Sequence, residues 1–398
     1  MTDTHKHAAP RKPKQEQEPA GEEVTEVAPD VLRMQLPIWM PGLGHVNMYG
    51  LVDKRGVAIV DPGLPGPQSW SALKKRLKHA GFRIKDVHTV IVTHSHPDHF
   101  GGAGRLARAS GAKLITHHAF STWTVKGPSP QRALTEGEAR RLEAEAAAVA
   151  QSVDVLPEDM PEPFQPDEIP TIHDPAIVPD DTDETEATAT PWGQVTPWGT
   201  RNPGPPRKRK LMIRAMRLLF TPPEPTDRLH HGERMRLADR DWFVVHTPGH
   251  TVDHLCAWDP ETGTLLTGDH VLPSITPHVS GVRKADSLQS YLATLDLVAQ
   301  LDGVKVGLPA HGHPFTDVAG RVEAIKEHHQ ERMEMLVEAS RGLGDATVQQ
   351  LSREVFPKRH WGVMAESETF AHLEHLEHEG KVERWEQDGM LMYRVHSA

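Results

Sequence analysis

Short apolar blocks separated by turn-forming residues run through the first third of the chain, and their spacing predicts alternating strands and helices. Residues 48–53 and 56–63 are apolar runs joined by the turn Asp53-Lys54-Arg55-Gly56, which predicts two strands. Residues 69–81 place apolar side chains on one helical stripe, which predicts an amphipathic helix. The next blocks predict a buried strand at 88–94, a helix at 102–111 and a strand at 112–118. This alternation is typical of α/β architecture.

Residues 120–225 interrupt the alternation, and we interpret them as a partly helical insertion between two halves of one domain. Residues 135–153 are rich in Ala, Glu and Arg, which favours a helix. An acidic, proline-rich run follows from about 157 to 183, and so long a stretch without regular structure is usually functional or disordered. The insertion also holds Thr-Pro-Trp-Gly twice, at 190–193 and 196–199, and a basic cluster at 205–210.

Strand patterns resume after the insertion and give way to helices near residue 318. Residues 234–250 and 255–270 alternate in polarity and contain a Pro-Glu-Thr-Gly turn, which predicts a hairpin region. The rest of the chain predicts helices at about 318–340, 344–356 and 366–380, then two short strands joined by Asp388-Gly389. Two helices followed by a two-strand hairpin is the order of a winged-helix module. At the other end, residues 1–28 are polar and charged, which predicts a disordered tail.

Composition narrows the class of protein. The chain of 398 residues has the length of two domains, and its apolar fraction of 37% fits some unpacked linker. The formal net charge of −11 gives the whole molecule no electrostatic reason to bind nucleic acid or anionic lipid. The N-terminus lacks the apolar segment of a secretory signal, and no stretch reaches the roughly 18 apolar residues that span a bilayer. The single cysteine, Cys256, fits a reducing compartment, so we expect a soluble cytoplasmic protein.

One short segment carries the strongest chemical signal. His94-Ser95-His96-Pro97-Asp98-His99 directly follows the apolar run 90–93. A strand that ends in a tight loop can direct several side chains at one point, and imidazole and carboxylate groups suit zinc or similar ions. Surface histidines in a turn are the alternative, but this combination of residue types and spacing is rare even in a chain with 27 histidines.

The segment resembles the hallmark of the metallo-β-lactamase superfamily, His-x-His-x-Asp-His after a sheet strand. Four further positions resemble that family's motifs in the right order: Asp61 in IVDPG, His250 in HTPGHT, Asp269 in LTGDH and His311 in LPAHGHP. The resemblance covers roughly residues 35–315 apart from the insertion. It implies an α+β fold, the αββα sandwich of that superfamily, over residues 29–317. A C-terminal winged-helix domain would follow at 318–398.

The resemblance also implies a site for two divalent metal ions. One ion would be held by His94, His96 and His250, the other by Asp98, His99 and His311, with Asp269 bridging the two. Zinc is the first expectation, and iron or manganese also suit these ligands. A hydroxide shared by the two ions would attack the substrate, because metal binding lowers the pKa of water. Asp98 and Asp61 are the expected catalytic residues, with Asp61 orienting a ligand from behind the metals.

Several other histidines lie near the implied ligands and compete with them. His254, His270 and His313 are each within a few residues of a motif position, and the motif favours its own members over these three. His45 either reaches the mouth of the site or packs in a loop. The remaining candidates for structural rather than ligand roles are His117, His118 and His246, together with Cys256 in an apolar strand.

The motifs and the predicted domain order are compatible with three functions. The first is hydrolysis of a small-molecule thioester, ester or lactone, because Asp269 stands where class B lactamases often have cysteine, and an aspartate there resembles glyoxalase II. The second is a phosphodiesterase or endoribonuclease such as those of the β-lactamase-like protein 2 type, favoured by the tail and by the basic cluster 205–210. A solvated linker is nonetheless the preferred interpretation of that cluster. The third is a DNA-binding regulator, opposed by the complete ligand set.

The predicted C-terminal module argues against nucleic acid. Residues 319–398 carry ten Lys or Arg and fifteen Asp or Glu, a net charge of −5. The helix that would enter a DNA groove carries glutamates, which phosphates repel. We therefore interpret the module as a packing or dimerisation element, and a homodimer and a small-molecule substrate are the expected partners.

Overall fold

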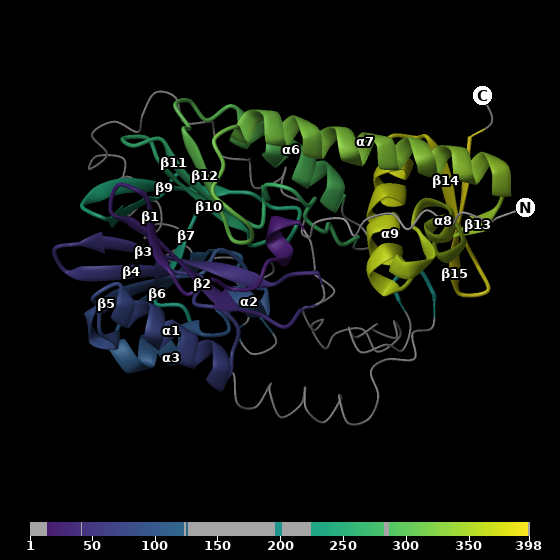
Figure 1. Ribbon diagram of the computed structural model, residues 1–398. Helices are drawn as coiled ribbons and strands as arrows, with labels where there is room; N and C mark the ends of the chain where they lie inside the picture. The colour runs from purple at the N-terminus through teal and green to yellow at the C-terminus, as the bar shows by residue number, and fades with distance from the viewer. Residues whose placement is uncertain are drawn as a thin grey trace, which may run out of the picture.

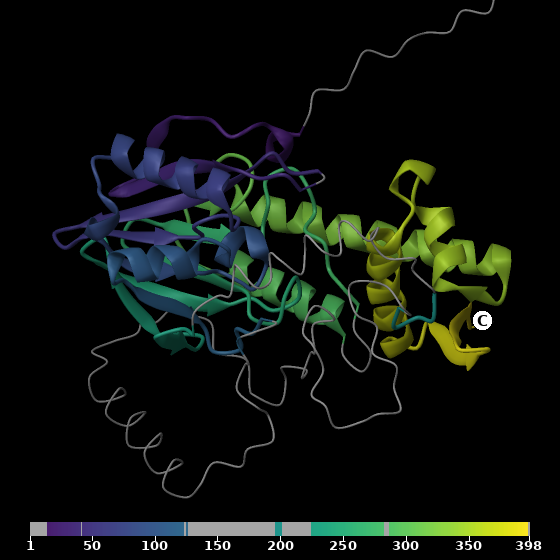
Figure 2. The same cartoon turned by 90° about the horizontal axis from the view of Figure 1, so that it is seen from below.

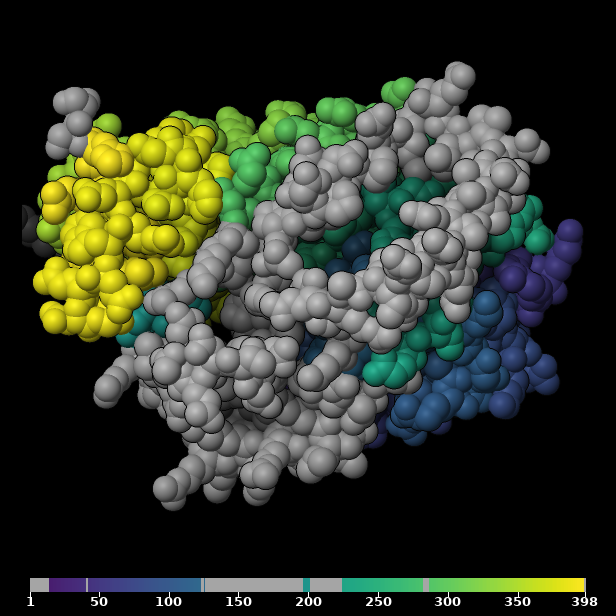
Figure 3. Space-filling view, turned by 180° about the vertical axis from the view of Figure 1, so that it is seen from behind, coloured from purple at the N-terminus to yellow at the C-terminus, as the bar shows by residue number. Residues whose placement is uncertain are grey.

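The chain folds into a four-layered body with a smaller group of helices and strands at one end (Figure 1). The computed structural model describes residues 14–40, 42–122, 125, 196–200, 224–281 and 286–396. Seen from behind, the C-terminal residues in yellow gather at one end of the molecule, away from the purple and blue N-terminal residues (Figure 3).

The first sheet has seven strands in the order β1-β2-β3-β4-β5-β6-β7. Strands β1 to β4 pair antiparallel and β4 to β7 pair parallel. The predicted turn at residues 53–56 is confirmed, because Asp53 pairs with Gly56 across the β3–β4 hairpin. The strands are β1 (Val24–Ala28), β2 (Val31–Pro37), β3 (His45–Asp53), β4 (Gly56–Val60), β5 (Val87–Ile91), β6 (Lys113–His117) and β7 (Asp227–Leu229).

Helices α1 (Pro67–His79) and α3 (Ala103–Ser110) cover the outer face of this sheet (Figures 1 and 2). Leu73, Leu77 and Leu106 pack there against the buried strand residues in one apolar cluster. Helix α3 ends where predicted, because Gly111 takes a left-handed conformation (φ 87°) that a residue with a Cβ atom rarely adopts. A short 3-10 helix, η2 (Ile84–Asp86), leads into β5.

The second sheet has five strands in the order β12-β11-β10-β9-β8. Its inner face packs on the first sheet, where Trp242 and Leu266 share an apolar cluster with Tyr49 of β3. Helices α6 (Ser287–Ala299) and α7 (Val318–Leu343) cover its outer face (Figure 1). The predicted αββα sandwich is therefore confirmed. The strands are β8 (Arg234–Leu237), β9 (Arg240–His246), β10 (Leu255–Asp259), β11 (Thr264–Gly268) and β12 (Val306–Pro309).

The C-terminal elements follow the predicted order of helix, helix and hairpin. The hairpin turns at Asp388 (φ 52°) and Gly389 (φ 73°), the left-handed pair that a two-residue hairpin loop requires. Among the described residues, no helix combines the length and apolar character needed to cross a membrane. The elements are β13 (Ala346–Thr347), α8 (Val348–Val355), η3 (Lys358–His360), α9 (Val363–His378), β14 (Val382–Gln387) and β15 (Met390–Val395).

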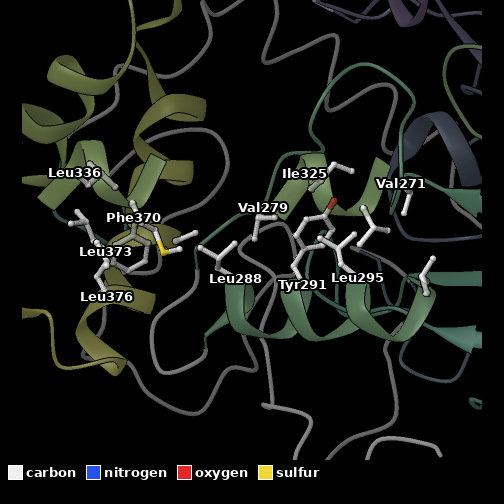
Figure 4. Close-up of a cluster of buried hydrophobic side chains, with 14 of the residues drawn as sticks. Val271, Val279, Leu288, Tyr291, Leu295, Ile325, Leu336, Phe370, Leu373 and Leu376 are labelled. Atoms are coloured by element: carbon white, nitrogen blue, oxygen red, sulfur yellow. The ribbon is translucent and has the colours of Figure 1, made fainter. Parts of the chain in front are cut away.

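One apolar cluster joins the C-terminal elements to the sandwich. Helix α7 packs against α6 and also against α8 and α9, so it belongs to both parts. Val279, in the loop before α6, lies between Phe370 of α9 and Tyr291 of α6 (Figure 4). The predicted boundary between residues 317 and 318 falls at the start of this shared helix, and it remains a prediction.

The structure describes only part of the two segments that the sequence predicts to be irregular. The disordered tail predicted for residues 1–28 is wrong for residues 14–28, where η1 (Gln15–Gln17) and strand β1 are placed. Strand β1 lies at the edge of its sheet, because only β2 pairs with it. In the insertion, Trp198 is buried against Phe370, and its Nε1 donates to Glu366. The predicted helix at 135–153, Trp192 and the basic cluster 205–210 lie outside the described residues.

We expect Phe370→Ala to destabilise the fold by about 3–5 kcal/mol, because it empties a fully buried position in the shared apolar cluster. Denaturant unfolding followed by tryptophan fluorescence measures this. Met364→Ala, a change at a side chain that is 63% exposed in the same helix, is the control and should shift stability by less than about 0.5 kcal/mol. Equal losses in the two variants would contradict the shared core.

Candidate metal centre

The segment 94–99 occupies the loop that follows β5. His94 and His96 lie in this loop, and His96 is the N-cap of the one-turn helix α2 (Pro97–Phe100), which carries Asp98 and His99. Pro97 at the first helical position lacks an N–H and so suits a helix start. Strand, loop and turn together point the side chains of this segment into the edge of the sandwich.

Three other elements end at the same edge. His250 lies in the loop between β9 and β10, Asp269 directly follows β11, and His311 follows β12. Strands β11 and β12 are parallel neighbours, so their carboxyl ends lie side by side. The sheets therefore bring together residues that are up to 217 positions apart.

The seven side chains form two adjoining groups whose ligand atoms lie within 4.8 Å of one another in each group. The first comprises His94, His96, His250 and Asp269, and the second comprises Asp98, His99 and His311.

Asp269 lies between the two groups. Its Oδ2 is 3.6 Å from His250 Nε2 and 3.5 Å from His99 Nε2. Its Oδ1 is 3.3 Å from His311 Nε2. One carboxylate thus faces nitrogens of both groups, which is the arrangement that a bridging ligand needs.

Asp61 lies behind the second group. Its Oδ2 accepts from His99 Nδ1 (2.8 Å), and its two oxygens accept from the amide (2.9 Å) and hydroxyl (2.8 Å) of Thr93. Asp61 adopts a left-handed backbone conformation (φ 51°). The hydrogen bond to Nδ1 leaves Nε2 as the free nitrogen of His99 and directs it at the cluster.

Three of the other imidazoles, those of His94, His250 and His311, are oriented in the same way, whereas Nδ1 of His96 lies 3.1 Å from Nε2 of His250. Thr93 Oγ1 lies 3.0 Å from Nδ1 of His94. His250 donates from Nδ1 to the carbonyl of His278 (2.6 Å), and His311 donates from Nδ1 to the carbonyl of His45 (2.6 Å). In each case the outward nitrogen is bound to the protein, so the inward nitrogen is the one that faces the cluster.

The inward atoms fit a metal ion. Nε2 of His94, His99 and His311 and Oδ1 of Asp269 are buried and have no hydrogen-bond partner among the described residues. Leaving a buried polar atom without a partner costs about 1–3 kcal/mol. Four such atoms that face one another are therefore explained by cations, and imidazole and carboxylate suit zinc, iron or manganese.

Ionisation also favours cations here. Burial opposes the charged form of Asp269, but His311 and His99 hold its pKa well below the usual range. Burial likewise lowers the pKa of His311, but Asp269 and Asp98 raise it to about 10. The carboxylates are thus charged, with protons on neighbouring imidazoles as counterions, and a metal ion that binds there displaces protons.

Two of the three competing histidines have other partners. His254 Nε2 accepts from the Asp269 amide (3.0 Å) and its Nδ1 donates to Thr247 (2.7 Å), so it supports the Asp269 backbone. His313 contacts Glu18 and Arg33 at the surface. His270 is buried but belongs to neither group.

The structural histidines and the cysteine lie where the sequence predicts. His117 and His246 stack with ring centroids 3.7 Å apart, and His118 stacks on His230. Cys256 is buried in β10, and burial raises the pKa of its thiol to about 12, which fits a core residue.

The N-terminal segment, residues 14–18, supports the site, a contribution that no sequence pattern predicts. Glu16 is fully buried, and its carboxylate accepts from the amides of Ser274 and Ile275 and from the Ser274 hydroxyl. The carbonyl of Glu18 accepts from Nδ1 of His45 (2.7 Å), the residue whose own carbonyl holds His311. Residues 14–18 therefore brace loops that support both groups, a role hidden because their polar composition is that of a tail.

Two candidate metal-binding groups at the edge of an αββα sandwich are the arrangement expected of a metal-dependent protein. The sequence profile of the metallo-beta-lactamase superfamily matches residues 41–311. The chain belongs to that superfamily.

Similarity to individual proteins extends this result. A metallo-beta-lactamase family protein from Thermus thermophilus has a similar structure, with a TM-score of 0.64 and 27% identity, covering 93% of this chain and all of that one. A beta-lactamase domain protein from Burkholderia ambifaria gives a TM-score of 0.63 at 23% identity, covering 95% and 96%, which supports the fold alone.

Curated relatives match over a shorter region. Lactamase-like protein nscB of Trichophyton equinum is 34% identical over 109 residues, 27% of this chain and 31% of that protein. Lactamase-like protein adaB of Aspergillus niger is 29% identical over 119 residues, 30% of this chain and 35% of that protein. The matched region spans about a third of these relatives.

We expect Asp61→Asn to weaken metal binding about 10–100-fold, because the amide nitrogen cannot accept the bonds that orient His99. Competition with a chromophoric chelator measures the affinity. Asp86→Asn, which alters an exposed ion pair with Arg83, is the matched control and should bind metal as the wild type does. Unchanged affinity in Asp61→Asn would show that Asp61 does not orient a ligand.

We expect Glu16→Ala to lower stability by about 1–3 kcal/mol, because three donors on the 274–275 loop lose their acceptor. Thermal unfolding measures this loss, and the metal-bound form should show it too. Glu23→Ala at an exposed position is the control. If both variants unfold like the wild type, residues 14–18 do not brace the site.

Proposed function

We propose that the protein is a dinuclear metal-dependent hydrolase that acts on a small-molecule thioester, ester or lactone. The observation that carries this proposal is the position of Asp269, which faces inward nitrogens of both ligand groups. The seven predicted residues would be the ligands, with Asp269 as the bridge. Zinc is the expected metal, and iron or manganese suit the same atoms.

The identity of the bridging residue supports the choice of substrate class. Asp269 stands where class B lactamases often have cysteine, and an aspartate resembles the site of glyoxalase II and of related thioesterases and lactonases. Both of its oxygens face imidazole nitrogens, which a cysteine with its single sulfur atom cannot do. Hydrolysis of β-lactams is therefore not the proposed reaction.

The chain's own residues would orient the metal ligands and carry the proton that passes from water to the leaving group. When bound, two divalent ions lower the pKa of water and polarise the carbonyl of the substrate. Asp98 Oδ2 lies 3.5 Å from His99 Nε2 and 3.4 Å from His311 Nε2, within the second ligand group, and its carboxylate would take up the proton that the attacking water loses. Water adds its oxygen to the acyl carbon, the C–S or C–O bond breaks, and the proton goes to the leaving thiol or alcohol.

The alternatives gain less support from the C-terminal elements. Two of the glutamates on the helix that would approach nucleic acid are buried: Glu366 bonds Trp198, and Glu374 bonds Tyr393 and Arg384. They hold the C-terminal elements together, as a packing role for this predicted winged helix requires. The net charge of −5 over residues 319–398 adds to the case against RNA and DNA.

One assay separates the hydrolase from the nuclease. It measures turnover of esters, thioesters, lactones and a labelled RNA, each with and without chelator. We expect chelator-sensitive turnover of one of the first three classes. Asp269→Asn should reduce it by more than about 100-fold, since it changes the proposed bridge itself. Asp302→Asn at an exposed position is the control. Metal-dependent cleavage of RNA alone would refute the small-molecule assignment.

A further inference from the structure

The loop between β11 and α6 connects the metal centre to the C-terminal helices. Its residue His278 accepts a hydrogen bond from His250 through the backbone carbonyl (2.6 Å). The imidazole of His278 contacts α9, where its Nδ1 lies 3.7 Å from Glu368 Oε2. Glu368 of the C-terminal elements is therefore linked to the proposed metal ligand His250 through a single intervening residue, His278.

Arg332 of α7 completes a polar cluster with His278 and Glu368. Arg332 Nε is 3.9 Å from Glu368 Oε1. The side chains are 22% (His278), 19% (Glu368) and 15% (Arg332) exposed, so the cluster is neither sealed in the core nor free in solvent. We call these three residues the 278–332–368 cluster.

The cluster has unused hydrogen-bonding capacity. Its two contacts, at 3.7 and 3.9 Å, are longer than hydrogen bonds. His278 Nε2 and Arg332 Nε are buried atoms with no hydrogen-bond partner among the described residues. Arg332 is nonetheless held in place, because its Nη1 donates to the carbonyl of Val355 (3.2 Å) and its guanidinium lies over the Phe356 ring.

The charges of the cluster restrict what it can bind. Burial opposes ionisation of Glu368, but His278, His372 and Arg332 outweigh it and lower its pKa to about 2, so the carboxylate is charged. Glu368 and Arg332 together carry no net charge, so the pair favours neither an anionic nor a cationic group. A neutral group that both donates and accepts, such as an amide or a hydroxyl, can bind both residues.

We propose that the 278–332–368 cluster is a substrate subsite that binds an uncharged amide or hydroxyl group next to the scissile bond. The group would donate to Glu368 and accept from Arg332. This inference rests on the proposed function, because it places the polar arm of the substrate beside the metal centre. It also gives the C-terminal elements a part in substrate selection.

A purely structural ion pair is the competing explanation, and substrate kinetics separate the two. The probes are the thioesters S-acetyl-N-acetylcysteamine, whose arm contains an amide, and S-pentyl thioacetate, whose arm has the same number of chain atoms and no amide. Because hydrogen bonds to charged groups are worth more than about 1.4 kcal/mol, we expect the wild type to have a KM about tenfold lower for the amide probe.

Glu368→Gln and Arg332→Lys should each raise the KM for the amide probe about tenfold and leave kcat and the pentyl probe nearly unchanged. Glu331→Gln, at an exposed position on α7, is the matched control. Thermal unfolding and metal content check that each variant is intact. If Glu368→Gln fails to fold, Arg332→Lys, which keeps the positive charge at that position, still tests the subsite. Equal KM values for the two probes in the wild type, or equal effects of the variants on both, would overturn the subsite.

A binding measurement decides the case in which neither thioester is hydrolysed. Calorimetric titration uses two uncleavable thioethers, S-methyl-N-acetylcysteamine and methyl pentyl sulfide. Preferential binding of the amide compound that is lost in Glu368→Gln supports the subsite even though the proposed reaction has failed. Binding of neither compound, or of both equally, overturns the subsite independently of the reaction.

Discussion

The constraint on which this structure depends is the burial of inward-facing nitrogen and oxygen atoms that the protein itself leaves without hydrogen-bond partners. Such atoms repel or remain unsatisfied unless something outside the chain binds them. The protein holds them there by binding their outward nitrogens: Asp61 holds His99, and the carbonyls of His278 and His45 hold His250 and His311. The fold around the site is therefore organised as a support for side chains whose own interactions are incomplete.

That support comes from segments that are remote from one another in the sequence. The loop carrying His278 is bound by Glu16 from the N-terminal segment, and Arg321 of α7 donates to two of its carbonyls, at Leu272 and Ile275. Val279 of the same loop enters the apolar cluster that contains Phe370. Packing of the C-terminal helices and geometry of the proposed metal centre are thus linked through residues 270–281 of the loop between β11 and α6.

Much of the sandwich and the grouping of the seven side chains could be predicted from the sequence, because each depends on local pattern. The apolar runs and the turn at residues 53–56 specify strands, and the segment 94–99 carries its own signature. Partners contributed over long separations could not be predicted. The burial of Glu16 depends on the 274–275 amides, and the contact of His278 with Glu368 depends on how α9 packs; neither has a local pattern. The ligand roles themselves and the domain boundaries remain predictions.

The left-handed backbone at Asp61 places local strain at the residue that orients His99. A side chain in that conformation costs of the order of 1 kcal/mol, which glycine would avoid. Exchange for glycine would relax the main chain but leave three buried donors without their acceptor, namely the amide and hydroxyl of Thr93 and Nδ1 of His99. Each such loss costs about 1–3 kcal/mol, and the three together exceed the strain. Folding stability and the orientation of His99 therefore favour the same residue, an aspartate, in a backbone conformation that would otherwise favour glycine.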